Sequence, residues 1–308
     1  MKHAWHSAIV LTVVILLPAA HATASETQGG TRGGFYVGAD IGASIPHDLK
    51  STRSNTGIPT NCDQWLDDVT LPSGDTVPLP LSQCAPRSLP SSPNTFDLST
   101  GFLAGFSIGY ALPYNLRVEA EYFHQRSNGG RSDLIVPGDP KQQEFVQRSE
   151  QIGAVRKNSV FANLYYDFHN MISPRVTPYV GAGLGLTHMA IRYSATSIRT
   201  SNRQTLIDLG RNPNAAGTES RADETLSDML FGYQVMAGLD YALSEQLMAG
   251  IKLRYGNAFD DFSDGDKAWK PLRSHESTVG PGGAPVRYGI NADGLGFWGI
   301  SLSLRYYL

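Results

Sequence analysis

The chain has 308 residues, with 25 Lys and Arg against 28 Asp and Glu, 17% charged residues and 32 glycines. The near-neutral balance excludes a protein held to nucleic acid by phosphate contacts, so we predict no nucleic-acid partner. A mean hydropathy of −0.22 also excludes a polytopic helical membrane protein.

Residues 1–24 have the composition of a cleaved secretory signal peptide. Lys2 gives a charged start, residues 8–17 form an apolar run, and residues 22–24 (Ala-Thr-Ala) fit a small-residue cleavage pattern. The run is shorter than the roughly 17 to 25 apolar residues that a membrane-anchoring helix needs. We therefore expect export, with residues 25–308 forming the mature chain.

After the signal peptide the dominant hydrophobic period is two, which predicts β-strands. In residues 116–125, for example, Leu116, Val118 and Ala120 alternate with charged residues that a helix would scatter around its surface. Eight segments follow this rule: 35–45, 101–112, 116–125, 160–168, 180–187, 231–241, 247–255 and 297–308.

The connections between these segments alternate between short and long. The four long ones, about 46–97, 127–156, 194–227 and 260–292, are rich in Gly, Pro, Ser, Asn, Asp and Arg. Short turns at one end and long loops at the other predict an all-β fold, an eight-stranded antiparallel up-and-down transmembrane β-barrel of the outer-membrane type. We expect extracellular loops and periplasmic termini in the bacterial outer membrane.

The non-apolar face of the predicted strands carries charges of both signs. A soluble barrel such as a lipocalin buries apolar side chains inside, so its polarity would be the opposite. In a membrane barrel these charges must line the lumen, because an Arg or Lys facing lipid at mid-bilayer costs about 2 to 4 kcal/mol. We predict that they pair in a lumen charge network that obstructs ion flow. Its members are Asp40, Arg117, Glu119, Glu121, Asp167, Asp240, Lys252, Arg254 and Arg305.

The two cysteines lie in the first long loop. Cys62 and Cys84 enclose a stretch rich in Pro, Ser and Asp. In an exported protein we expect them to form one disulfide, the alternative being two unrelated free thiols. Such a disulfide would order the loop more than it stabilises the barrel.

Three blocks of the predicted strands are more specific than alternation alone. They are Gly109-Tyr110 with residues 117–121 (Arg-Val-Glu-Ala-Glu), residues 159–163 with Tyr165-Tyr166-Asp167, and residues 177–185. These blocks resemble the bacterial outer-membrane surface-antigen (major surface protein) family, and more broadly the chain is similar to opacity-type and OmpA-type barrels. The resemblance implies an outer-membrane location, surface exposure, and a role in host contact or passive permeability.

No residue pattern predicts catalysis, a cofactor or a metal. Five histidines of the mature chain are scattered without metal-ligand spacing: His47, His124, His169, His188 and His275. The acidic run 260–266 lacks calcium-loop spacing, because Phe262 holds its third position. We predict no enzyme, with an outer-membrane lipid-modifying enzyme as the less favoured alternative.

The predicted function is that of an integral outer-membrane surface protein whose loops serve interaction, adhesion or antigenic display. The alternative is a narrow porin for small solutes or ions. Predicted partners are outer-membrane lipids, lipopolysaccharide, and host or environmental surface ligands of the loops. Six basic residues are expected to meet lipopolysaccharide phosphates, with solvated surface charge as the alternative: Arg126, Arg131, Arg148, Arg156, Lys157 and Arg192.

Overall fold

The computed structural model describes residues 33–59, 69–70, 76–77, 86–134, 143–209, 213, 216–217, 219–263, 268–269, 272–273 and 286–308. The predicted signal peptide and both cysteines, Cys62 and Cys84, lie outside these residues, so cleavage and the disulfide stay predictions. Within the described ranges no helix is long and apolar enough to cross a membrane.

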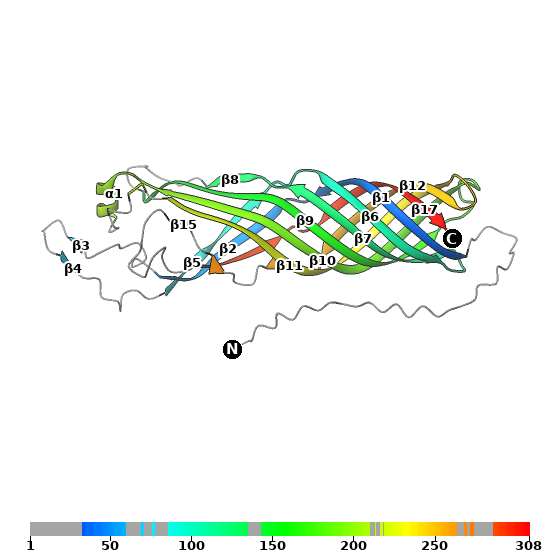
Figure 1. Ribbon diagram of the computed structural model, residues 1–308, viewed down its shortest axis with the longest axis horizontal. Helices are drawn as coiled ribbons and strands as arrows, with labels where there is room; N and C mark the ends of the chain where they lie inside the picture. The colour runs from blue at the N-terminus through cyan, green and yellow to red at the C-terminus, as the bar shows by residue number, and fades with distance from the viewer. Residues whose placement is uncertain are drawn as a thin grey trace.

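Eight antiparallel strands close into a barrel (Figure 1). Around the wall they are β1 (Gly34–Pro46), β6 (Gly101–Ala111), β7 (Leu116–Asn128), β9 (Phe145–Asp167), β10 (Val176–Arg199), β11 (Glu219–Ala242), β12 (Leu247–Ala258) and β17 (Phe297–Tyr307). β1 pairs with both β17 and β6, and β9 pairs with β10, so every barrel strand has two neighbours. The predicted eight-stranded antiparallel barrel is confirmed, and its closure leaves no unpaired strand edge in the wall.

Short turns join β6 to β7, β9 to β10 and β11 to β12 at the end of the barrel that also holds the C-terminus (Figure 1). In the first turn Tyr114 and Asn115 both adopt a φ of 64°. The turn is closed by the Leu112 amide, which donates to the Leu116 carbonyl at 2.8 Å. We call this the short-turn end and the opposite one the long-connection end.

At the long-connection end the wall continues well beyond the length that the alternation predicted. β9, β10 and β11 have 23, 24 and 24 residues, whereas β1 has 13. A second sheet in the order β13, β16, β2, β5 prolongs the pairing of β17, β1 and β6. The further elements are β2 (Leu49–Pro59), β3 (Val69–Thr70), β4 (Thr76–Val77), β5 (Pro86–Phe96), β8 (Arg131–Leu134), α1 (Arg203–Asp208), β13 (Phe262–Ser263), β14 (Ala268–Trp269), β15 (Leu272–Arg273) and β16 (Val286–Asp293).

We call this prolonged part the extension: β2, β5, β8, β13, β16 and the parts of β9, β10 and β11 at residues 145–156, 188–199 and 219–230. It corrects the expected loop bounds, because regular strand occupies part of each range predicted as loop. The physical reason is that the ladders of β10 with β9 and β11 run on to residue 198 with one register shift between Ile191 and Tyr193. The structured barrel is therefore longer than its membrane-crossing part.

Candidate functional sites in the lumen and on the outer wall

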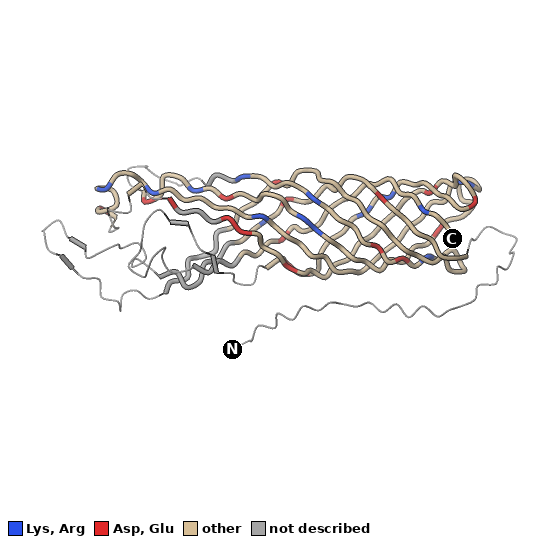
Figure 2. The backbone as a smooth tube through the Cα atoms, viewed as in Figure 1, with Lys and Arg blue, Asp and Glu red and all other residues tan. Residues whose placement is uncertain are grey.

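Between the short-turn end and the extension the barrel is polar inside and apolar outside. The nine predicted lumen charges are all buried, while outward apolar side chains such as Phe106 and Leu302 are 56% and 65% exposed. Both signs of charge are spread along these strands (Figure 2). Because successive side chains of a strand point to opposite faces, the alternation in the sequence produces this two-faced wall.

The first layer of the lumen, nearest the short-turn end, is a group of four charges. The Arg117 guanidinium donates to both carboxylate oxygens of Asp167, at 2.6 and 2.8 Å. Arg305 Nη2 donates to Asp240 Oδ2 at 2.9 Å, and Asp240 lies 4.0 Å from Arg117 Nη2. The Arg117 guanidinium carbon also lies 4.7 Å from the centre of the Tyr165 ring. Each buried cation thus has an anion, which offsets the cost of removing both from water.

A second layer of four charges lies one step farther along the lumen. Arg254 Nη2 donates to Glu121 Oε1 at 2.7 Å and to Asp40 Oδ2 at 3.1 Å. Lys252 Nζ donates to Glu121 Oε1 at 3.0 Å and lies 3.8 Å from Asp40 Oδ1. Gln234 Nε2 also donates a hydrogen bond to Glu121 Oε2 at 3.0 Å. Two cations face two anions, so this layer is balanced without solvent.

Glu119 lies between the two layers and is held by tyrosines. Its carboxylate accepts from Tyr36 at 3.0 Å and from Tyr165 at 3.1 Å, and no ion pair of Glu119 occurs among the described residues. Gly109 makes room for this arrangement, since a Cβ there would lie 2.2 Å from Cζ of Tyr36. The predicted network is therefore divided into two ion-pair groups, with Glu119 joining them through hydroxyl groups that the sequence analysis did not select.

Beyond the second layer an aromatic cluster enters the lumen, beside further buried polar side chains. Phe123 and Phe161 stack with ring centres 5.6 Å apart, and Leu103 and Phe297 pack with them. The Arg254 guanidinium lies 4.5 Å from the centre of the Phe123 ring and so caps this aromatic layer. A space of about 20 Å³ adjoins it, which has room for about one water.

The extension has a hydrophobic core on the inside of the wall. Side chains of β9, β10 and β11 that point inward there pack with residues of β2, β5, β13 and β16. The core comprises Leu49, Phe96, Ile152, Val155, Met189, Ile191, Tyr193, Leu226, Leu230, Phe262, Ile290, Ala292 and Leu295. The inner face is thus apolar in the extension and polar below it, a reversal that the sequence analysis did not predict.

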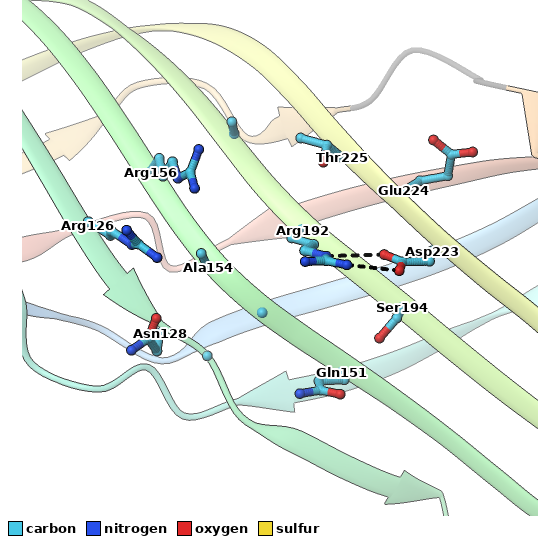
Figure 3. Close-up of a pocket in the computed structure, with 13 residues that line it drawn as sticks. Arg126, Asn128, Gln151, Ala154, Arg156, Arg192, Ser194, Asp223, Glu224 and Thr225 are labelled. Atoms are coloured by element: carbon cyan, nitrogen blue, oxygen red, sulfur yellow. Dashed lines mark hydrogen bonds and ion pairs between the residues drawn. The ribbon is translucent and has the colours of Figure 1, made fainter.

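The outward face of the extension is polar and holds a groove of about 920 Å³ (Figure 3). Arg126 of β7 and Arg156 of β9 lie directly opposite one another in register at its edge. Arg192 of β10 pairs across the groove with Asp223 of β11, Nη2 to Oδ2 at 3.1 Å and Nε to Oδ1 at 3.3 Å (Figure 3). The hydrogen bonds that Arg192 donates to the Asp223 carboxylate raise the pKa of the exposed Arg192 above its ordinary value.

Comparison with known proteins identifies this architecture. Residues 9–282 match the family described as the outer membrane protein beta-barrel domain. The chain belongs to this family. This agrees with the resemblance to outer-membrane surface barrels found in the sequence.

Among relatives, the outer membrane protein PagN of Salmonella typhimurium is 28% identical over 163 residues. The match covers 51% of this chain and 57% of PagN, so the chain spans little more than half the length of that relative. Neisserial surface protein A aligns over 89% of this chain and 97% of its own, with 18% identity and a TM-score of 0.34. OprG from Pseudomonas aeruginosa aligns over 92% and 100%, with 14% identity and a TM-score of 0.40.

In an outer-membrane beta-barrel domain the exposed apolar band of the wall is the surface that contacts lipid. Aromatic pairs mark its two borders. Tyr255 packs on Trp298 below the extension, with ring centres 5.0 Å apart, and Phe35 packs on Tyr110 near the short-turn end at 4.8 Å. These pairs are placed as interfacial girdles are in this family.

The six predicted basic residues do not form one site. Arg126, Arg156 and Arg192 meet at the groove, whereas Lys157 points inward and donates to the Leu295 carbonyl at 2.5 Å. Arg148 lies over the Phe145 ring, its guanidinium carbon 5.6 Å from the centre. Arg131 lines a separate cavity farther along the extension. In the described part of the chain no group of three His, Cys, Asp or Glu side chains could hold a metal ion.

Proposed function

We propose that this outer-membrane barrel is a non-conducting surface protein, which turns its long-connection end to the cell exterior and interacts with host or environmental surface ligands through it. The observation that supports this most is the series of side-chain layers that occupies the lumen in the described part of the chain. Two ion-pair layers are followed by an aromatic layer and then by the hydrophobic core of the extension.

An ion crossing this lumen would meet two different barriers. At the level of Asp40, Glu121 and Arg254 it would have to separate buried partners that are 2.7 to 3.1 Å apart. Above them, Phe123 and Phe161 offer no polar group to replace its hydration shell, which makes entry costly. An eight-stranded barrel has an interior just wide enough for its own side chains. These features favour display over the alternative of a narrow porin.

Planar-bilayer recording of the purified, full-length mature protein tests the closed lumen. We expect no stable openings from the wild-type protein or from Arg254→Ala, because the core of the extension still blocks the lumen of the variant. Unitary, voltage-stable openings of the wild-type protein would contradict the proposal and establish the pore. Heat-dependent mobility on gels verifies that both proteins are folded barrels.

The orientation has a separate test on intact cells. An epitope inserted after Gly217, in an exposed turn of the extension, is expected to bind antibody without permeabilising the outer membrane. The same epitope in the turn at residues 243–246, between β11 and β12, serves as the matched control and is expected to bind antibody only after permeabilisation. The reverse result would place the extension in the periplasm and refute display.

A further inference from the structure

The outward faces of β7, β9 and β10 form a continuous track that changes from apolar to cationic along the strands. In the register of β7 and β9, Ala120 lies opposite Ala162, His124 opposite Asn158, and Arg126 opposite Arg156. The track therefore crosses from the lipid-facing band to the groove of the extension on one side of the barrel.

At the cationic end of the track two arginines lie directly opposite one another on neighbouring strands. Like charges placed directly opposite on neighbouring strands repel, yet Arg126 faces Arg156 at the groove. Neither side chain takes part in an ion pair in the described part of the chain, and both are exposed. Two carboxylates, Asp223 and Glu224, also line the groove, but Asp223 is engaged by Arg192. The β7–β9 side thus presents two free guanidinium groups, which an anionic oxygen cluster would satisfy.

The apolar end of the track is a depression in the lipid-facing wall. Its volume is about 1080 Å³, and it is lined almost wholly by apolar surface. Its lining combines small side chains at Ala120, Ala162 and Ala182 with larger ones such as Phe106 and Leu184. Such a hollow fits a flexible hydrocarbon chain better than a flat wall does, because more of the chain's surface makes van der Waals contact with the wall.

The spacing of the two ends matches one leaflet of a membrane. Six residues separate Ala120 from Arg126, which is about 20 Å along a strand and about 15 Å along the membrane normal at a tilt of about 40°. Half of the hydrocarbon core of a bilayer is also about 15 Å thick. Between the ends, Asn158 Oδ1 accepts from the Tyr122 hydroxyl at 2.9 Å and lies 2.8 Å from His124 Nδ1, a polar level suited to the interface.

Groups that could meet a sugar lie next to the groove. A cavity of about 260 Å³ farther along the same strands is lined by hydroxyl and amide side chains, among them Gln147, Ser149 and Thr196. Gln151 and Ser194 line both this cavity and the groove. Acyl chain, phosphate and saccharide would thus each have a matching surface in the correct order.

We propose that the outer wall of β7, β9 and β10 is a binding site for one phosphorylated glycolipid of the outer leaflet, with a phosphate between Arg126 and Arg156 and an acyl chain over Ala120 and Ala162. The placement in the outer leaflet rests on the orientation proposed above. The site itself does not, so a binding measurement on purified protein separates failure of the site from failure of the orientation.

The test uses the folded full-length mature protein in detergent and three probes: lipid A, lipid A stripped of its phosphates, and the deacylated phosphorylated disaccharide. Affinities are measured by native mass spectrometry. Arg126→Gln/Arg156→Gln is expected to weaken lipid A binding at least about tenfold, because two charged hydrogen-bond donors are lost. Arg175→Gln, an exposed arginine at the short-turn end, is the matched control and is expected to bind as the wild type does.

A second variant tests the acyl part. Ala162→Phe fills the depression and is expected to weaken lipid A binding several-fold while leaving the deacylated disaccharide unaffected. Ala249→Phe, an outward alanine on β12, is its control. The proposal is overturned by equal lipid A affinity of the double-arginine variant and wild type, by indifference of the wild type to the phosphates, or by an Ala162→Phe variant that binds lipid A normally.

Discussion

The strand β10 passes through two regions of opposite polarity. Up to Leu186 its outward residues are apolar and exposed, while Tyr179 and a series of glycines point inward. From Met189 onward its inward residues are apolar and buried, and Arg192 points outward into the groove. One strand therefore has its apolar face outward in the lipid-facing barrel and inward in the extension, as in a soluble β-protein. The difference is decided by the solvent outside, lipid below and water above.

The two regions consequently hold together by different forces. In the lipid-facing barrel, inward charges such as Arg254 and Glu121 must find partners, because each is removed from water by the wall. In the extension, burial of Met189, Ile191 and their neighbours supplies about 25 cal/mol for each Å² of apolar surface removed from water. Substitutions of one kind should therefore have opposite consequences in the two regions.

The largest effect is expected from a charge placed inside the extension. Ile191→Asp removes a side chain that is 1% exposed and buries an unpaired carboxylate, at a cost of at least about 4 kcal/mol. We expect the extension to unfold locally while the barrel below stays closed. Hydrogen exchange of β10 should show lost protection after residue 188 alone. Ser194→Lys, an outward charge on the same strand opposite Asp223, should leave exchange unchanged; uniform loss along β10 would contradict two separately stabilised regions.

The next effect concerns the polar lumen. Arg254→Ala leaves Asp40 and Glu121 with Lys252 as their remaining cation, and breaking a buried pair in this way costs about 3 to 5 kcal/mol. Urea unfolding in lipid vesicles should show a correspondingly lower midpoint. Adding Glu121→Gln should restore part of the loss, because the orphaned charge is removed. A variant as stable as the wild type would show that the layer is solvated.

An outward charge distinguishes the two regions on their outer faces. Leu184→Arg puts a cation in the lipid-facing band and should cost about 2 to 4 kcal/mol, since Leu184 lines the apolar depression of this band. Ser194→Arg, ten residues farther along β10 and also outward, should change stability by at most about 0.5 kcal/mol. Vesicle unfolding of both variants measures the contrast. Equal losses would mean that lipid also covers the extension.

The barrel could be predicted because lipid imposes a rule that each short segment obeys on its own. Leu116, Val118 and Ala120 face outward and Arg117 and Glu119 inward, and this parity alone places them correctly. The alternation therefore predicts which residues of each strand face outward, and how many strands there are, without knowledge of tertiary contacts.

The extension was not predicted because inward residues were expected to be polar along the whole length of each strand. Met189, Ile191 and Tyr193 keep the inward parity of Gly183 and Gly185, yet they are apolar where lumen residues were expected to be polar. The signal in the sequence is that the alternation continues while the apolar residues change from the outward to the inward positions.

The ion pairs inside the lumen could not be predicted from the alternation. Arg254 of β12 meets Glu121 of β7 across the barrel, and such a contact depends on strand stagger, which the local sequence pattern does not contain.

The two regions also contain the same kind of ion pair in different surroundings, and the smallest effect of all is expected at the exposed pair. Arg117 with Asp167 and Arg192 with Asp223 are both two-pronged arginine–aspartate pairs, but the first is buried and the side chains of the second are 65% and 54% exposed. Asp167→Asn should lower the unfolding midpoint strongly, because it leaves a buried guanidinium with its nearest remaining carboxylate oxygen 4.0 Å away. Asp223→Asn should leave the midpoint unchanged within error at any salt concentration, since water replaces the lost partner. If the two substitutions cost the same, the outer face of the extension is not bathed in water, and the contrast between the regions is wrong.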